Sequence, residues 1–230
     1  MSLALAAVAL LAYLGARETR VFAVRSIEVE GVRGAVARRV ETALVPLEGT
    51  SLLKVNGDHV TRLATALPYV AGVTYDRAFP NTLRVRVETE RPLAVVRRGI
   101  EAWLVSRRGR ATERIEEGTH RTLPRIWLPK TADVALGATL GTGAGAEEVA
   151  MLAPLHEARL ARRVASVHRA DGQWVYMLRG GLELRVGTPS DLPLKLAVAR
   201  RILTRTSVSG YLDVSVPEWP VAGLDPQVSG

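Results

Sequence analysis

Hydrophobic and charged residues alternate most regularly between residues 83 and 90. Leucine and valine occupy every second position from Leu83 to Val87, and the positions between them carry arginine. Such alternation predicts a β-strand with one covered face and one face in water. The turn-forming pair Pro80-Asn81 stands just before it, so we expect a hairpin that joins this strand to a strand at residues 70–75.

Upstream of this hairpin the apolar spacing changes from every second residue to every third or fourth. Residues 34–45 carry this helical spacing, and Asp58 stands where it would cap a second, shorter helix that ends near Pro68. A short alternating stretch at residues 27–29 predicts a strand before both helices. The first part of the chain is therefore expected to run strand, helix, helix, strand, strand.

Beyond Pro92 the pattern indicates shorter strands separated by turns. Residues 111–122 are charged and are interpreted as a loop, and the prolines after residue 216 argue against any later regular element. The expected elements are strands at 93–96, 102–105, 163–169, 173–178, 182–186 and 211–216, and helices at 146–160 and 191–204. The fold class is therefore α+β, and the second part is a mostly antiparallel β domain with flanking helices.

Residues 3–16 form an uncharged apolar run at the amino terminus. A helix of this length spans about 21 Å, whereas the hydrocarbon core of a bilayer is about 30 Å thick. The run predicts a truncated or marginal transmembrane helix at 1–17, and it leaves open a signal-peptide core or a buried helix of a soluble protein. Arg17 and Arg20 follow it and on their own favour a cytoplasmic carboxyl side. This charge pattern conflicts with an exported bulk of the chain. A positively charged cytoplasmic leader before residue 1, missing from this sequence, would resolve that conflict.

Composition excludes several kinds of chemistry. The net charge is +8, but the arginines are scattered without a run of five basic residues, which is typical of a solvated surface rather than a nucleic-acid site. The absence of cysteine excludes thiol catalysis, cysteine-bound zinc and disulfides.

No segment carries a convincing active-site signature. Residues 141–146 read Gly-x-Gly-x-x-Ala, but no buried strand is predicted before them and no acidic residue follows at the distance that a dinucleotide site needs. The four histidines lie far apart in sequence, and Glu88 and Glu90 share a strand face with arginines. We therefore predict no catalytic, cofactor-binding or metal-binding residue. An exported enzyme with a dispersed site remains a rival, because such residues meet only in the fold.

The last predicted strand, at residues 211–216, is the best candidate for an interaction site. A strand near the edge of a sheet leaves N–H and C=O groups open, and an extended partner segment can pair with them. Trp219 just beyond it would be a large apolar anchor. The alternative is an internal strand with Trp219 folded onto the core.

Several short motifs, taken in order, resemble the FtsQ/DivIB family of bitopic bacterial cell-division proteins, whose first soluble domain is a POTRA domain. Each motif is weak alone, but their order and spacing are fairly specific and cover the chain from the apolar run to about residue 221. They are Val24-x-x-Ile27-x-Val29-x-Gly31, Leu67-Pro68-x-Val70, Phe79-Pro80-x-Thr82-Leu83, Val87-x-x-Glu90-Arg91-Pro92-x-Ala94, Trp103-Leu104-Val105, Leu123-Pro124, Leu184-x-Val186-Gly187, Lys195-Leu196 and Tyr211-Leu212-Asp213.

The resemblance implies a transmembrane helix at 1–17, a POTRA domain at 22–91, a β domain at 92–221 and a tail at 222–230. It implies a non-enzymatic scaffold at the division septum, anchored once in the bacterial cytoplasmic (inner) membrane with its bulk on the periplasmic side. Its expected partners are FtsB/FtsL-type membrane proteins, without nucleic acid, small-molecule substrate or cofactor. By motif position, the resemblance implies that the partner-binding residues are Lys195, Tyr211, Asp213, Ser215, Val216 and Trp219.

Two departures from the family pattern and one rival function accompany this resemblance. The cytoplasmic leader is almost absent, and Ser106 stands where an acidic residue often precedes the turn at Gly109. The rival is a POTRA module of an outer-membrane secretion or assembly system that binds passing client strands. That rival needs a downstream series of barrel strands, which the sequence does not show.

Overall fold

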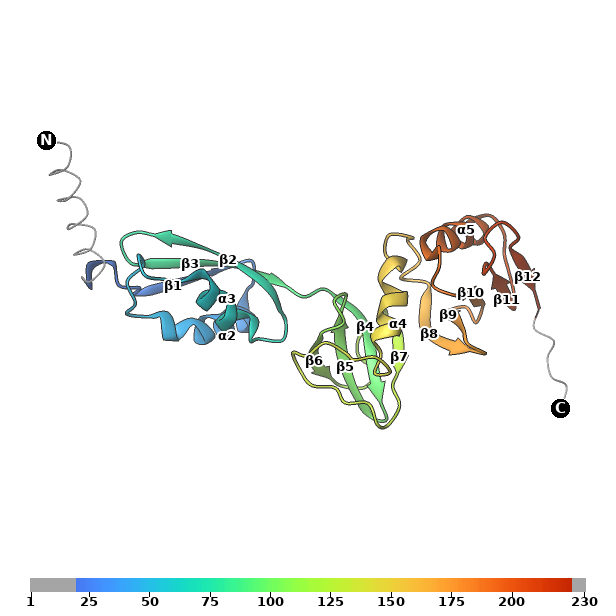
Figure 1. Cartoon of the computed structure of the whole chain (residues 1–230), viewed down its shortest axis with the longest axis horizontal. Coiled ribbons are helices and arrows are strands. Elements are labelled where there is room, and N and C mark those ends of the chain that lie inside the picture. Colours follow the sequence, from blue (N-terminus) through green and yellow to red (C-terminus); the bar gives the residue numbers. More distant parts are fainter. Residues whose placement is uncertain (1–19, 225–230) are drawn as a thin grey trace, which may run out of the picture. The chain divides into compact units, whose positions relative to one another are not determined.

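The computed structural model describes residues 20–224 (Figure 1). The predicted transmembrane helix at 1–17 lies outside these residues. Within residues 20–224, no helix has both the length and the apolar character needed to cross a membrane. The chain divides between Glu90 and Arg91 into two compact units.

The first unit is a three-stranded sheet covered by two helices. Strand β3 (Thr82–Thr89) lies in the middle, parallel to β1 (Ser26–Glu30) and antiparallel to β2 (Val70–Ala78). Helices α2 (Gly34–Leu44) and α3 (Gly57–Thr65) pack on one face of this sheet (Figure 1). The order strand, helix, helix, strand, strand expected from the sequence is confirmed.

The alternation along β3 decides which face of this sheet the helices cover. Leu83 and Val85 are fully buried in the core with α2 and α3. Arg84 and Arg86 lie on the other face, where each forms an ion pair with a glutamate of β1. These pairs are partly exposed to water, so they keep the outer face soluble and add little stability.

One detail of the first unit differs from the expectation. The cap of α3 is Asn56, whose side-chain oxygen accepts a hydrogen bond from the Asp58 N–H at 2.8 Å. Asp58 instead lies in the first turn, where its carboxylate complements the positive end of the helix dipole. The expected cap was therefore wrong by two residues, because both residue types favour a helix start.

The second unit is a nine-stranded sheet in the order β12-β11-β10-β9-β8-β7-β4-β5-β6. Two antiparallel groups, β4-β5-β6 and β8-β9-β10, are joined through β7, which runs parallel to both β4 and β8. The strands are β4 (Pro92–Arg98), β5 (Glu101–Ser106), β6 (Ala111–Ile115), β7 (Arg125–Trp127), β8 (Val164–Ala170), β9 (Gln173–Leu178), β10 (Glu183–Gly187), β11 (Tyr211–Asp213) and β12 (Val221–Gly223). This unit is the large β domain expected from the sequence.

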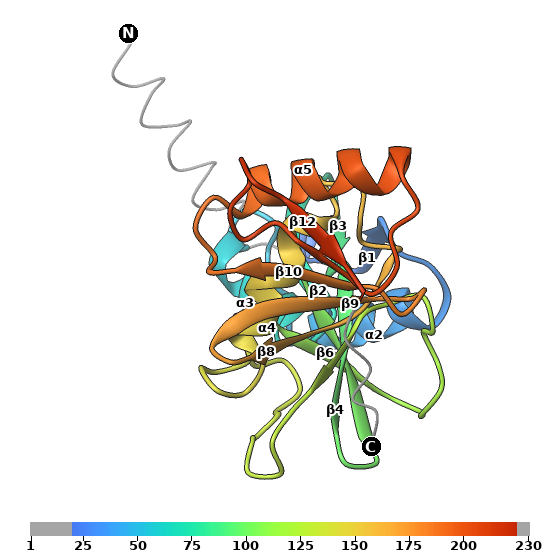
Figure 2. The same cartoon turned by 90° about the vertical axis from the view of Figure 1, so that its right-hand side faces the viewer.

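One face of the large sheet carries the helices and the main core. Helix α4 (Ala146–Leu152) continues into the 3₁₀ turn η3 (Ala153–Leu155), and α5 (Leu192–Arg205) lies alongside β10 (Figure 2). Leu196 of α5 and Leu212 of β11 are buried in the same cluster as the inward residues of β8 to β10. The sheet and both helices therefore share one hydrophobic core.

Two predictions for residues 111–160 of the second unit were wrong. Residues 111–122 were expected to be a loop, but the first five form β6, whose Thr112 hydroxyl donates to the Leu104 carbonyl at 3.2 Å. Its exposed Glu113 and Arg114 suit an edge strand, where charge discourages pairing with other chains. The helix expected over 146–160 ends at Leu152, because Pro154 cannot continue an α-helix.

Replacing Tyr176 with phenylalanine is expected to lower the free energy of unfolding by about 1–2 kcal/mol near pH 8. The buried Tyr176 hydroxyl donates to the Met151 carbonyl at 2.6 Å, and the variant leaves that carbonyl without its donor. Burial also raises the pKa of Tyr176 far above its usual value. The folded protein therefore keeps this proton, while the unfolded chain releases it above about pH 10.

The stability that Tyr176 contributes is consequently complete below about pH 10 and falls as the pH rises further. The phenylalanine variant has no such dependence at this position. Denaturant unfolding at pH 8 and pH 11 measures the difference in the free energy of unfolding between the unsubstituted protein and Tyr176→Phe. This difference should narrow by up to about 1.4 kcal/mol per pH unit above pH 10. A difference that is the same at both pH values would contradict the burial argument.

Candidate protein-docking surface

Strand β12 forms one edge of the large sheet. It pairs antiparallel with β11 on one side, and no strand of residues 20–224 lies on its other side. The N–H and C=O groups on that side are therefore open to an added strand. The sequence predicted this role for residues 211–216, but β11 covers only Tyr211–Asp213 and is an interior strand between β10 and β12.

A tight reversal of the chain brings β12 to the sheet. The Asp213 carboxylate accepts a hydrogen bond from the Ser215 N–H at 2.8 Å, and the Trp219 N–H donates to the Val216 carbonyl at 3.0 Å. Pro217 lies in this reversal and Pro220 just before β12, where neither has to supply a ladder N–H. The expectation that the prolines exclude a later strand was therefore wrong.

Large apolar side chains are exposed in β12 and in the residues that flank it in the sequence. Trp219 is 79 % exposed, and three aliphatic residues within and beside the last strand are also exposed: Val216, Val221 and Leu224. Exposed apolar groups gathered around an open strand edge are typical of a protein interaction site. Of the predicted contact residues, Val216 and Trp219 are thus on the surface.

Tyr211 and Asp213 hold the last two strands in place. The Tyr211 ring lies under the Arg185 guanidinium at 4.2 Å and over Gly223, where a Cβ would come within 2.9 Å of the ring. Asp213 uses its carboxylate within the reversal. Both residues and Ser215 are half-buried, so they shape the surface around β12 as well as lining it.

Lys195, the predicted contact on the helix, lies inside the unit. It is only 4 % exposed, and its ammonium donates hydrogen bonds to the carbonyl oxygens of Val186 at 3.0 Å and Thr188 at 2.9 Å. A partner carboxylate could reach it only if these bonds were broken. Lys195 instead ties α5 to the connection that leaves β10.

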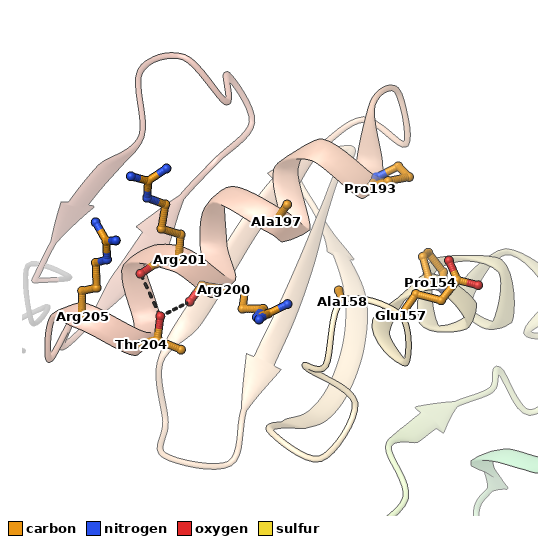
Figure 3. Close-up of a pocket in the computed structure, with 9 residues that line it drawn as sticks. All are labelled: Pro154, Glu157, Ala158, Pro193, Ala197, Arg200, Arg201, Thr204 and Arg205. Atoms are coloured by element: carbon orange, nitrogen blue, oxygen red, sulfur yellow. Dashed lines mark hydrogen bonds between the residues drawn. The ribbon is translucent and has the colours of Figure 1, made fainter.

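A groove of about 630 Å³ runs between α5 and the segment around η3 (Figure 3). Small apolar residues form one part of it: Pro154, Ala158, Pro193 and Ala197. Its basic part carries Arg200, which extends towards Ala158, and Arg201 and Arg205, which extend from the other side of α5 (Figure 3). None of these arginines forms an ion pair with a residue in 20–224, and Glu157 is the one acidic residue that lines the groove.

The described residues offer little for catalysis. No group of three or more potential metal ligands occurs among residues 20–224. Hydrogen bonding and charge from Arg98, with the charge of Arg114, hold the pKa of the Glu101 carboxyl below its usual range, so this group stays ionised instead of acting as an acid. Residues 142–145 form turns before α4, whose first residue is Ala146. A dinucleotide-binding strand-turn-helix unit is therefore not formed there.

Two family models match most of the chain. The model for the FtsQ-type POTRA domain matches residues 22–91, and the model for the C-terminal domain of cell division protein FtsQ/DivIB matches residues 94–215. The chain belongs to the FtsQ/DivIB family. The resemblance drawn from the sequence motifs is thereby confirmed, and with it membership of a non-catalytic family of cell-division scaffolds. No curated protein matches the chain.

Several residues of the candidate docking surface were not predicted from the sequence of this FtsQ/DivIB protein. Val221 and Leu224 are exposed in and just after β12, and Arg200, Arg201 and Arg205 line the groove, but none of them was predicted. One sequence pattern could have predicted the basic part of the groove: the basic residues at helical spacing on the last helix. No sequence pattern predicted the open edge at β12, and the family match ends at residue 215, before this strand.

Proposed function

We propose that this FtsQ/DivIB protein is a non-enzymatic scaffold of the division machinery that docks FtsB/FtsL-type partners and so helps to regulate septal wall synthesis. It would be anchored in the cytoplasmic membrane through residues 1–17, at the septum, with its bulk on the extracytoplasmic side. The observation that carries this proposal is the open edge of β12 with Trp219 exposed beside it.

Strand addition at β12 would supply the main contact. An extended partner segment pairs its backbone with the open N–H and C=O groups, which gives affinity, while side-chain pockets give specificity. Trp219, Val216 and Val221 are available as apolar anchors around that segment. Tyr211 and Asp213 would act indirectly, because they hold β12 in register with β11.

The groove beside α5 would supply a second contact. Its basic part suits carboxylates of a partner, and its small residues let a second backbone approach closely. A partner segment with an extended part and an acidic part would occupy both sites. Charge complementarity of this kind raises the association rate and selects the partner more than it raises affinity.

Replacing Trp219 with alanine is expected to weaken partner binding by about 30-fold, the effect of losing an interface hot spot. The measurement is the dissociation constant between the full-length protein in lipid nanodiscs and the extracytoplasmic part of its FtsB/FtsL-type partner. Trp127→Ala is the matched control, because Trp127 is also exposed, at 60 %, but lies in β7. Equal losses for the two variants, or no loss for Trp219→Ala, would contradict the docking site.

Reversing the charge that extends into the groove, Arg200→Glu, is expected to slow partner association by about threefold at low salt. The effect should shrink as the salt concentration rises, because exposed charges are screened within about 10 Å at 0.1 M salt. Stopped-flow association at two salt concentrations measures it. Arg114→Glu on the remote edge strand β6 is the control, and an equal slowing there would show a general charge effect instead of a groove.

A further inference from the structure

Three segments of the first unit meet beside the point where residues 1–19 join it. The Leu52 N–H donates to the Phe22 carbonyl at 2.7 Å, and the Arg25 N–H donates to the Asn81 carbonyl at 2.9 Å. The rings of Phe22 and Phe79 meet edge to face with their centroids 5.6 Å apart. We call this region, made of residues 20–25, 49–53 and 77–81, the POTRA tip.

The POTRA tip exposes apolar side chains that the rest of the unit hides. Phe79 is 55 % and Val21 is 60 % exposed, and Phe22 and Leu53 beside them are half-buried. Among residues 20–90, Val45 is the one other large hydrophobic residue exposed to this degree. The exposed apolar surface of this unit is therefore concentrated at one end.

The tip is held in a fixed shape. Arg77 donates hydrogen bonds from its guanidinium to the carbonyl oxygens of Leu52 at 2.7 Å and Val55 at 3.0 Å, and it lies over the Tyr75 ring at 5.5 Å. These contacts fasten the hairpin end that carries Phe79 to the neighbouring loop. Phe79 is thus presented outwards by a rigid support, which lowers the entropy lost when it binds a surface.

The sequence on the amino-terminal side indicates what this end meets. The uncharged apolar run ends at residue 16, and a chain extends at most about 3.6 Å per residue, so Val21 lies within roughly 18 Å of the end of that run. Arg17 precedes the tip in the sequence, and Arg20 and Arg25 are among its residues. The tip segments contain no acidic residue, and the exposed acidic residues next to them in the sequence are Asp76, whose carboxylate accepts the Arg77 N–H, and Glu48.

We propose that the POTRA tip rests in the interface of an anionic phospholipid bilayer, with Val21 and Phe79 entering the boundary between headgroups and acyl chains. This inference rests on the membrane anchoring in the proposed function. Exposed aromatic and aliphatic groups flanked by arginine match the chemistry of this boundary, where apolar burial and attraction to anionic lipid act together. The contact holds the first unit against the membrane surface and limits its rotation about the anchor.

The cysteine-free chain allows a direct test with single spin labels. The full-length protein, labelled at Asn81→Cys in the tip, is placed in vesicles containing phosphatidylglycerol. The accessibility of the label to oxygen and to a water-soluble nickel complex then reports its depth. The reference label is Glu88→Cys, an exposed position near the far end of β3. The ratio of oxygen to nickel accessibility is expected to be about fivefold higher at position 81 than at position 88.

Val21→Ser in the Asn81→Cys protein is expected to lower the oxygen-to-nickel ratio to the value at position 88, because it removes an apolar side chain that would enter the bilayer. Val21 is exposed, so the substitution leaves the fold intact. Phe79→Ser is the second variant and should act in the same direction. Equal ratios at positions 81 and 88 in the unsubstituted protein, or a ratio that Val21→Ser leaves unchanged, would overturn the proposal.

The two proposals fail in different ways. Partner capture at β12, measured on the same vesicles, should be unchanged by Val21→Ser. If the protein captures its partner but the label at position 81 is exposed to water, the tip contact is overturned and the docking proposal stands. A protein that does not float with the vesicles lacks the anchoring on which both proposals depend, and that result also overturns the tip contact.

Discussion

Binding of the FtsB/FtsL-type partner is expected to weaken by more than about 100-fold when Ala222 is replaced by proline. Ala222 is the middle residue of β12, pairs with Leu212 and is exposed. Proline removes its N–H and fixes its φ. If the Ala222 N–H points to the partner, the added strand loses a hydrogen bond. If it points to β11, the substitution removes a hydrogen bond that holds β12 on the sheet. Both routes remove the docking edge.

The measurement for this prediction is the dissociation constant obtained with the full-length protein in nanodiscs. Ala222→Val is the matched control, because a β-branched residue suits an exposed strand position and keeps the N–H. It should bind within about threefold of the unsubstituted protein, since an exposed substitution changes little. Unchanged binding by Ala222→Pro would place the partner contact away from β12.

Gly31→Ala is expected to destabilise the first unit by about 4 kcal/mol, whereas Gly34→Ala should cost about 1 kcal/mol. Both glycines have a positive φ, +87° and +61°, so both substitutions strain the backbone. They differ in space: a Cβ at Gly31 would lie 2.4 Å from the Val87 carbonyl oxygen, while nothing lies within 4 Å of one at Gly34. Comparing the two variants therefore distinguishes the cost of backbone strain, present in both, from the cost of a steric clash with β3, present only in Gly31→Ala.

The second unit should be indifferent to both glycine substitutions, because its core contains no residue of the first. All four tryptophans lie beyond residue 90, so tryptophan fluorescence follows the second unit and far-UV circular dichroism follows both. In denaturant, Gly31→Ala should shift the transition seen by dichroism and leave the fluorescence transition in place. Equal costs for the two variants, or a shifted fluorescence transition, would contradict the account.

The first unit could be predicted closely because its signals are local. The strand at residues 83–89 has a strict alternation, and the two helices carry apolar residues at helical spacing. Each pattern spans a whole element, so the burial of Leu83 and the exposure of Arg86 follow from sequence position alone. The order of the five elements then fixed the family resemblance.

The docking edge could not be predicted in the same way, because β12 depends on contacts that are distant in sequence. Residues 221–223 are too few to carry a period, and they follow a proline. They form a strand because the reversal held by Asp213 returns them to β11, where Gly223 leaves room for the Tyr211 ring. Nothing in the local pattern shows that return.

Lys195 shows that motif position does not reveal the surroundings of a side chain. A lysine on an otherwise amphipathic helix is usually exposed, and the family resemblance implied that it meets a partner. Its ammonium instead satisfies the carbonyl oxygens of Val186 and Thr188. These acceptors lie at the end of β10 and just beyond it, so only the fold reveals them.

Hydrogen exchange of the backbone amides tests the central claim, docking at β12, most directly. The full-length protein in nanodiscs is exchanged alone and with the extracytoplasmic part of its FtsB/FtsL-type partner, and peptides covering 211–224 and 107–115 are compared. The partner is expected to slow exchange across residues 221–224 and to leave the opposite edge strand β6 unchanged. Unchanged exchange at residues 221–224 in a complex shown to be fully formed would contradict docking at β12.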